Sequence, residues 1–147
     1  MAKKDLTLFV EEELNIMFRL NEEAKLYNGG TNLFKRAKGS ILHDFYNSIE
    51  RIFELISKDI DDTTINLNGN WHKRLLYQMT IEIKNIRPVV ISKELASELD
   101  EYLSFRHVFR SIYGFELEGK RLDNLINRLP EILNKFNSEI KTFLSIL

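Results

Sequence analysis

Residues 119–147 read GKRLDNLINRLPEILNKFNSEIKTFLSIL. One set of large apolar residues recurs in this stretch at spacings of only three and four, which makes it the clearest heptad-like pattern in the chain. The set comprises Leu122, Leu125, Leu129, Leu133, Phe136, Ile140, Phe143 and Leu147. The pattern predicts a long amphipathic helix whose apolar stripe packs in a core or in a dimer seam. Pro130 lies inside it and predicts a kink or a break near residues 128–129.

Four more segments with helical periodicity precede this stretch. The expected ranges are 5–28 (or from residue 7), 31–60 (or from residue 32), a short helix over 71–83, and 92–113. We expect Gly29-Gly30 to end the first helix, Ser92 to cap the fourth and Gly114 to end it. Gly39 inside the second helix predicts a close helix contact.

The connections between these segments carry little sign of strands. Residues 61–70 are rich in turn formers, and residues 85–90 read as extended because Pro88 disfavours helix at the residue before it. The whole pattern predicts an all-α fold, an up-and-down helical bundle of four long helices plus a short one. The length of 147 residues fits one domain over residues 1–147.

Composition excludes several classes of function. The chain has no cysteine and three histidines, so we expect no metal site and no disulfide. Its 21 basic and 22 acidic residues give a net charge of −1, so nucleic acid would have to bind a local basic patch. No apolar run approaches the length of a membrane span. We therefore expect a soluble, cytoplasmic protein that needs no membrane.

The stretch FRHVFRSIYGFEL, residues 105–117, packs cations into an apolar helical pattern. At about 100° per residue, one face of the helix would carry two guanidiniums and a phenol, with an imidazole and a hydroxyl on its flank. The face would hold Arg106, Arg110 and Tyr113, and the flank His107 and Ser111. Buried arginines need anionic partners. Those partners are either internal carboxylates or the phosphate of a ligand, and the pattern alone leaves both open.

Polar residues of the second helix also admit two interpretations. His43, Tyr46, Glu50 and Arg51 form either a solvated surface with one Glu50–Arg51 pair, or the opposite, substrate-binding wall of the arginine site. His72, next to Trp71, reads as structural.

At these residues the sequence resembles a family. Arg106 followed by Tyr113 resembles the motif of HEPN-domain toxins: arginine, four residues, histidine, one residue, tyrosine. The wider pattern is similar to the HepT-like ribonuclease toxins of bacterial toxin–antitoxin modules. The similar segments are residues 43–47, 49–54, 71–72, 87–92, 102–110 and 113–117, in that order.

The resemblance implies a HEPN-like bundle that forms a homodimer, with the motif helices of two subunits lining one composite site. It implies metal-independent RNA cleavage without a cofactor. The implied partner is a small nucleotidyltransferase antitoxin, which in some members of the family neutralises the toxin by adenylylating (AMPylating) the motif tyrosine. Tyr113 occupies that position here.

The sequence departs from the motif at Ser111, which stands where the motif has histidine. His107 lies one turn earlier and is the candidate substitute as the base. Arg106 and Arg110 would neutralise phosphate charge, and Tyr113 would bind phosphate or assist proton transfer. The alternative function is a catalytically inactive binding or regulatory subunit paired with a nucleotidyltransferase. A third possibility is a structural dimer whose arginines pair with acidic residues such as Glu50.

Overall fold

In the computed structural model, which describes residues 3–27, 34–113 and 116–147, five α-helices and one 3-10 turn follow one another without a strand. The elements are α1 (Lys3–Ala24), η1 (Lys25–Tyr27), α2 (Lys35–Asp59), α3 (Trp71–Gln78), α4 (Lys93–Ser111) and α5 (Gly119–Ile146). The predicted all-α bundle of four long helices and a short one is confirmed. Within the described parts of the chain, no helix could span a lipid bilayer. The predicted stops at Gly29-Gly30 and Gly114 and the predicted start at residue 31 or 32 lie outside the described residues.

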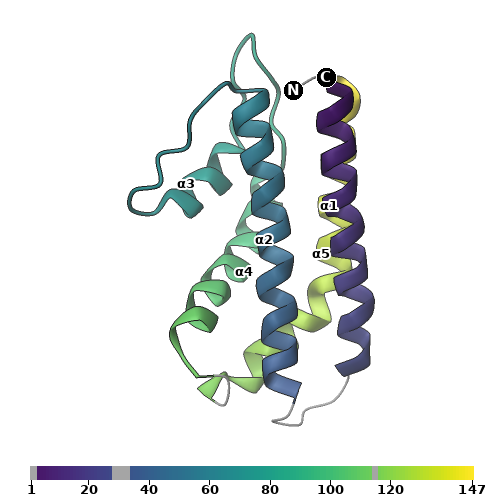
Figure 1. Cartoon of the computed structure of the whole chain (residues 1–147), viewed down its shortest axis with the longest axis vertical. Helices are drawn as coiled ribbons and strands as arrows, with labels where there is room; N and C mark the ends of the chain where they lie inside the picture. Colours follow the sequence, from purple (N-terminus) through teal and green to yellow (C-terminus); the bar gives the residue numbers. More distant parts are fainter. Residues whose placement is uncertain (1–2, 28–33, 114–115) are drawn as a thin grey trace.

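The long helices surround a core that α2 crosses from end to end. Figure 1 shows α1 and α2 side by side and antiparallel, α5 running along α1, and α3 projecting from the upper half of α2. The start of α1 and the end of α5 lie at the same end of the bundle (Figure 1). This arrangement places one long side of α2 against α3 and α4, which carry the residues discussed below.

The apolar stripe of α5 forms part of this core, as its spacing predicts. All of its members from Leu122 to Phe143 are buried, and the last, Leu147, is partly buried. Pro130 does not break the helix, which continues through it to Ile146. Proline removes one backbone hydrogen bond and crowds the preceding turn, so it bends a helix without necessarily ending it. Figure 1 shows α5 changing direction on its way to α1.

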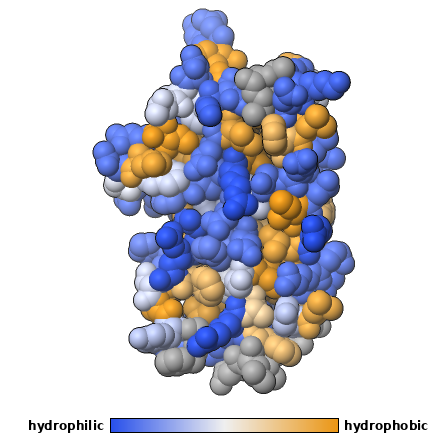
Figure 2. Space-filling model, viewed as in Figure 1, coloured by the Kyte–Doolittle hydropathy of each residue, from blue (hydrophilic) through white to orange (hydrophobic). Residues whose placement is uncertain are grey.

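The surface seen in Figure 2 is mainly hydrophilic, with hydrophobic side chains gathered over α1 and over the loop that leads into α3. Leu8, Phe9 and Ile16 in α1 are among the exposed apolar residues, as is Leu67 in the loop. Phe9 follows the apolar periodicity of the α1 sequence, yet it is about half exposed. Packing in the bundle therefore uses a narrower face of α1 than the periodicity indicates.

The third helix is shorter than predicted, because the chain after Gln78 finds other hydrogen bonds. The Thr80 hydroxyl donates to the carbonyl of Tyr77, and the carbonyl of Met79 accepts from the N–H groups of Val90 and Ile91. Residues 83–87 then form a tight reversal, with Asn85 at φ 68°. Residues 79–83, predicted to be helical, are therefore not helical: residues 79–81 form a turn and a bend, and Ile83 pairs with Arg87 in an isolated bridge.

The fourth helix is capped as predicted but ends early. Ser92 Oγ accepts from the N–H of Leu95, and Glu139 of α5 accepts from both the N–H and the hydroxyl of Ser92. At the other end, α4 stops at Ser111 and Ile112 is extended (φ −127°, ψ 163°). The prediction that Tyr113 shares the helical face of Arg106 is therefore wrong.

The reason for the early stop is a local competitor for the backbone. The carboxylate of Glu116 accepts from the N–H of Tyr113 at 3.0 Å, and the N–H of Glu116 donates to the carbonyl of Tyr113 at 2.9 Å. The Tyr113 amide is thus satisfied without a further helical turn. Its side chain is 70% exposed beyond the helix end.

Replacing Gly39 with alanine should lower the free energy of unfolding by about 1–2 kcal/mol. A Cβ there would lie 2.6 Å from Cε1 of Phe109 and 3.2 Å from a methyl group of Leu117. Overpacking typically costs about 1–3 kcal/mol, more than the helix-propensity gain of about 1 kcal/mol. Chemical denaturation measures the change. Gly119→Ala is the control, because its nearest neighbour would be 3.7 Å away and stability should be kept or raised. Equal gains in both variants would contradict the predicted close contact.

Candidate functional site

Arg106 joins α4 to α2 through a neutral side chain. Its Nε donates to Oδ1 of Asn47 at 2.7 Å, and Nδ2 of Asn47 lies 3.3 Å from Nδ1 of His43. A guanidinium can only donate, so the amide oxygen must face Arg106 and the amide nitrogen must face His43. Nδ1 of His43 is then the acceptor in this contact. The guanidinium of Arg106 is therefore held in place by a neutral group, so no carboxylate neutralises its positive charge in this contact.

Aromatic rings close one side of this group. The ring of Phe109 lies 5.6 Å from that of His43 and 6.1 Å from that of Phe105, measured between ring centres. Phe105 is buried, whereas Phe109 is only partly buried. Phe109 also packs closely over Gly39 of α2, where there is no room for a Cβ atom. The last turns of α4 are thus fixed against α2, and with them the position of Arg106.

A second polar contact joins α2 to α3, one turn along α2. Oε2 of Glu50 lies 2.7 Å from Nδ1 of His72. The Glu50 side chain is 8% exposed and that of His72 29%. The indole of Trp71 stacks on the imidazole with ring centres 3.7 Å apart. A nearly buried carboxylate therefore holds a histidine that solvent can still reach.

Further titratable groups lie around these two contacts. The hydroxyl of Tyr46 is buried without a hydrogen-bond partner. Burial raises its pKa, and the nearby carboxylates of Glu50 and Asp100 raise it further, whereas Arg106 lowers it. Burial, followed by Glu50, also raises the pKa of Glu54. The region between α2, α3 and α4 thus combines desolvation with interacting charges, which is the environment in which functional groups are tuned.

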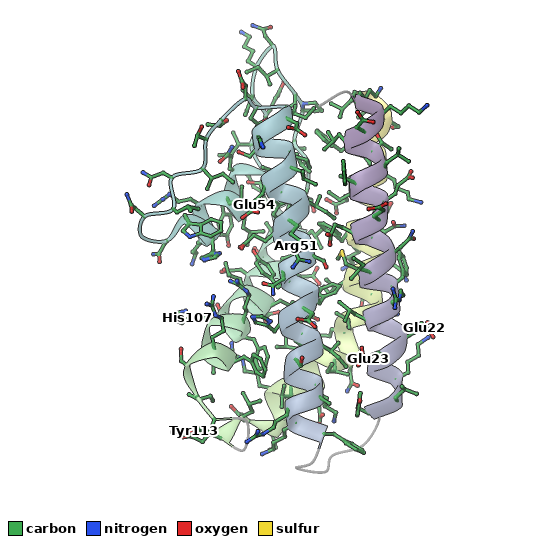
Figure 3. All side chains as sticks on the ribbon, viewed as in Figure 1. Glu22, Glu23, Arg51, Glu54, His107 and Tyr113 are labelled. Atoms are coloured by element: carbon green, nitrogen blue, oxygen red, sulfur yellow. The ribbon has the colours of Figure 1, made fainter. Side chains whose placement is uncertain are left out.

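The predicted catalytic residues of α4 lie at its exposed end. His107 and Arg110 are exposed, and Figure 3 shows His107 and Tyr113 on the α4 side of the molecule. Among the described residues, neither Arg106 nor Arg110 forms an ion pair with a carboxylate. The hypothesis that internal acids such as Glu50 neutralise these arginines is therefore not supported, and Glu50 pairs with His72 instead.

The structure places the residues of the predicted substrate-binding wall on α2 in different surroundings. His43 and Glu50 face α4 and α3, but the Tyr46 side chain is fully buried, so a substrate cannot touch it in this structure. Arg51 points elsewhere: it is largely exposed, and its Nη1 lies 3.8 Å from Glu13 of α1. The alternative of a solvated surface with a Glu50–Arg51 pair is wrong, because Glu50 pairs with His72 and Arg51 lies beside Glu13.

Two residues of this region were not among the predicted site residues. Asn47 stands four residues after His43, and that spacing places both on one helical face. His72 is separated from α2 in sequence, and its pairing with Glu50 arises only when α3 folds back. The i,i+4 spacing could have identified Asn47, whereas nothing local could have identified the partner of His72.

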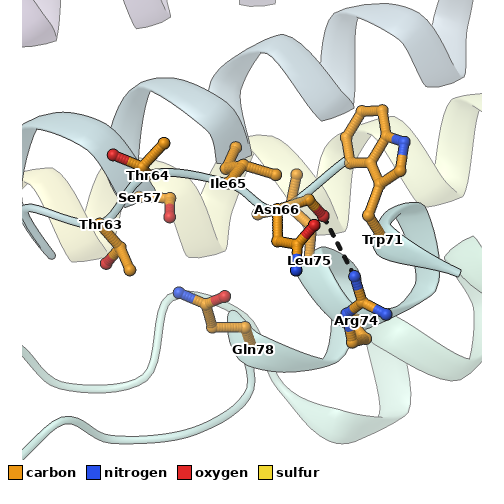
Figure 4. A pocket seen from close by; sticks show the side chains of 9 residues that line it. All are labelled: Ser57, Thr63, Thr64, Ile65, Asn66, Trp71, Arg74, Leu75 and Gln78. Atoms are coloured by element: carbon orange, nitrogen blue, oxygen red, sulfur yellow. Dashed lines mark hydrogen bonds between the residues drawn. The ribbon is translucent and has the colours of Figure 1, made fainter. Parts of the chain in front are cut away.

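A small cavity lies on the other side of Trp71, between residues 63–66 and α3. Its volume is about 210 Å³, smaller than the roughly 300–1,000 Å³ of typical ligand pockets. Figure 4 shows Arg74 reaching across it to the loop, where its guanidinium donates to the carbonyls of Asn66 and Asn68. In the described part of the chain, no three acidic or histidine side chains are grouped as metal ligands. The cavity contains no acid–base pair.

A family model described as HepT-like protein matches residues 37–147. The chain belongs to the HepT-like family. HepT-like proteins are HEPN-type toxins of toxin–antitoxin systems. No curated protein and no solved structure matches the chain.

The HepT-like match starts inside α2 and continues to the end of α5. It therefore includes both polar contacts of α2 and the arginine-bearing end of α4. The first helix lies outside the matched residues. Its role in this HepT-like protein is to cover the core side of α2 and α5, where Leu6, Val10, Leu14 and Met17 are buried.

Proposed function

We propose that this HepT-like protein is a metal-independent ribonuclease toxin, neutralised by a small nucleotidyltransferase antitoxin. The observation that carries the proposal is Arg106, a positioned guanidinium with no carboxylate partner among the described residues. Arg110 follows one turn later on the same side of α4. Two such cations form a local basic patch on a protein whose net charge is −1. Phosphate is the ligand that best matches this arrangement.

The chemistry requires few groups. The 2′-hydroxyl of RNA attacks the adjacent phosphorus, and the guanidiniums of Arg106 and Arg110 neutralise the charge that grows on the phosphoryl oxygens. Asn47 fixes Arg106 before the substrate arrives, so little reorganisation is needed. A histidine takes the proton of the hydroxyl. His43, His72 and His107 all lie on α2, α3 or α4 near this region, and Tyr113 remains a proposed phosphate contact.

In the proposed assembly two copies meet through α4 and line one composite site. His107 and Arg110 are exposed on this helix, so they are available to a second copy or to RNA. Joining two arginine pairs doubles the local positive charge. RNA then binds through its phosphates, and affinity should fall with salt.

The test is incubation of the pure protein with a mixed RNA pool in the presence of EDTA. We expect fragments that end in a 2′,3′-cyclic phosphate and begin with a 5′-hydroxyl, read by gel and by mass spectrometry. RNA left intact at every protein concentration would contradict the ribonuclease proposal.

One observation favours a second candidate function, a catalytically inactive subunit that the nucleotidyltransferase binds and modifies. Ser111, at the motif histidine position, uses its hydroxyl to donate to the carbonyl of His107 at 2.8 Å. It therefore supplies no acid or base. Tyr113 is exposed just beyond α4, where another protein can reach it.

We expect the partner nucleotidyltransferase with ATP to adenylylate the wild-type chain once, at the Tyr113 oxygen, with release of pyrophosphate. Tyr113→Phe should reduce the adduct at least about tenfold, because the attacking oxygen is gone. Intact-mass spectrometry measures it, with Tyr27→Phe as the matched control. An adduct of equal yield on Tyr113→Phe would exclude Tyr113 as the acceptor.

A further inference from the structure

We propose that His72 and Glu50 form the proton-transfer dyad of this site, in which His72 accepts the proton of the RNA 2′-hydroxyl. The proposal rests on the proposed ribonuclease function. Neither residue belongs to the arginine motif of α4: Glu50 comes from α2 and His72 from α3. The inference follows from how the three helices meet.

The contact between the two residues fixes which nitrogen can act as a base. Glu50 Oε2 lies 2.7 Å from Nδ1 of His72, and an ionised carboxylate can only accept. Nδ1 therefore carries a hydrogen, and Nε2 is the nitrogen through which the neutral ring acts as a base. Glu50 also stabilises the imidazolium that forms once Nε2 takes a proton, as the carboxylate does in other histidine–carboxylate pairs. The stacked indole of Trp71 holds the ring in this orientation.

The position of the dyad relative to Arg106 follows from α2. Arg106 binds Asn47 and His72 binds Glu50, and these two α2 residues are three positions apart. Side chains at that spacing are neighbours on one helix face, with Cβ atoms about 5–6 Å apart. The guanidinium and the imidazole thus approach adjacent turns of the same face. A phosphate on Arg106 would place its neighbouring ribose within reach of His72.

The other two histidines are less suited to the task. Nδ1 of His43 accepts from the Asn47 amide, and among the described residues no buried carboxylate contacts its ring. Asp44, its nearest acid, is exposed and 3.5 Å away. His107 follows Arg106 directly, so it points about 100° away around α4. Within the described residues, its ring has no hydrogen-bond partner.

The step balances without a metal or a redox partner. The 2′-oxygen gives its proton to Nε2 of His72 and bonds to phosphorus, and the bond from phosphorus to the 5′-oxygen breaks. The leaving oxygen takes a proton from water, and His72 returns its proton to the hydroxide that remains. The products are a 2′,3′-cyclic phosphate and a 5′-hydroxyl.

The decisive experiment compares cleavage rates of one oligoribonucleotide, in EDTA, by wild type, His72→Gln, Glu50→Gln and Arg106→Ala. His72→Gln should lose at least about 100-fold, and Glu50→Gln about tenfold or more, since general-base catalysis contributes about 10²–10⁴-fold. Lys141→Ala, an exposed change on α5, is the control, and circular dichroism reports folding. If His72→Gln cleaves as fast as wild type while Arg106→Ala does not cleave, the dyad is refuted and the ribonuclease function stands.

A second measurement, the NMR signals of His72, tests the dyad without RNA cleavage. In ¹⁵N NMR spectra, the neutral ring of His72 should carry its hydrogen on Nδ1 and not on Nε2. Glu50→Gln should lower the population of this tautomer. A 2′-O-methyl oligoribonucleotide, which binds but cannot react, should shift the His72 signals in wild type but not in Arg106→Ala. No shift in wild type overturns the dyad. A shift without cleavage by wild type overturns both the proton transfer and the ribonuclease proposal, and leaves an RNA-binding site.

Discussion

Replacing Arg87 with methionine should lower the free energy of unfolding by about 3–5 kcal/mol, the largest stability change we expect from one residue. Arg87 and Asp61 form a bidentate pair, Nε to Oδ1 at 2.6 Å and Nη2 to Oδ2 at 3.0 Å. Their side chains are 0% and 1% exposed. Removing one partner of a buried pair leaves the other charge unpaired and out of contact with water. The cost of that unpaired buried charge lowers the free energy of unfolding.

The guanidinium also satisfies the backbone around it. Nη1 donates to the carbonyls of Ile81 and Pro88, and Nη2 donates to that of Gln78. These carbonyls belong to the last residue of α3 and to the segment that connects α3 to α4. Arg87→Met therefore leaves three carbonyls to find other donors, and each unsatisfied one adds to the loss. Because this segment connects α3 to α4, the variant should also make the position of α3, and with it that of His72, less fixed.

Urea denaturation monitored by circular dichroism measures the change. Lys25→Met is the matched control, because the Lys25–Glu22 pair is 60% and 69% exposed and such pairs contribute about 0–1 kcal/mol. The double variant Arg87→Met with Asp61→Leu should recover much of the loss, since it leaves no buried charge. A loss under about 1 kcal/mol in the single variant would show that Asp61 finds water or another partner.

The sequence predicted best where one periodic pattern governs a whole element. The α5 stripe is buried as its spacing indicates, and Ser92 caps α4 through its own hydroxyl. Both features depend on residues within a few positions of one another. Helical periodicity and capping chemistry are local, so the chain order alone carries them.

The errors arose where distant or competing groups decide the structure. Glu116 satisfies the Tyr113 amide and ends α4 early, although the apolar pattern continues. The carbonyl of Met79 accepts from the N–H groups of Val90 and Ile91, and α3 ends at the preceding residue. The partner of Glu50 is His72, more than twenty residues away, and not the adjacent Arg51. A pattern read along one helix cannot reveal which helix folds against it.

Replacing Arg106 with alanine should reduce RNA cleavage by about 10²–10³-fold, the loss that follows removal of one preorganised donor to a developing oxyanion. Arg106→Lys should recover only part of the rate, because an ammonium keeps the charge but lacks the planar fork that bonds Asn47 and phosphate together. Single-turnover rates on one oligoribonucleotide measure both. Arg36→Ala is the matched control, since Arg36 is exposed in the first turn of α2 and should leave the rate within about threefold.

Asn47→Ala separates the charge of Arg106 from its placement. The guanidinium remains in that variant, but its hydrogen bond to α2 is lost, so binding should weaken less than the cleavage rate falls. If the site works through net charge alone, Asn47→Ala would cleave like wild type and Arg106→Lys would be fully active. If placement matters as the 2.7 Å contact indicates, both variants should lie between wild type and Arg106→Ala. Full activity of Arg106→Ala itself would remove Arg106 from the mechanism and leave Arg110 as the cation to test.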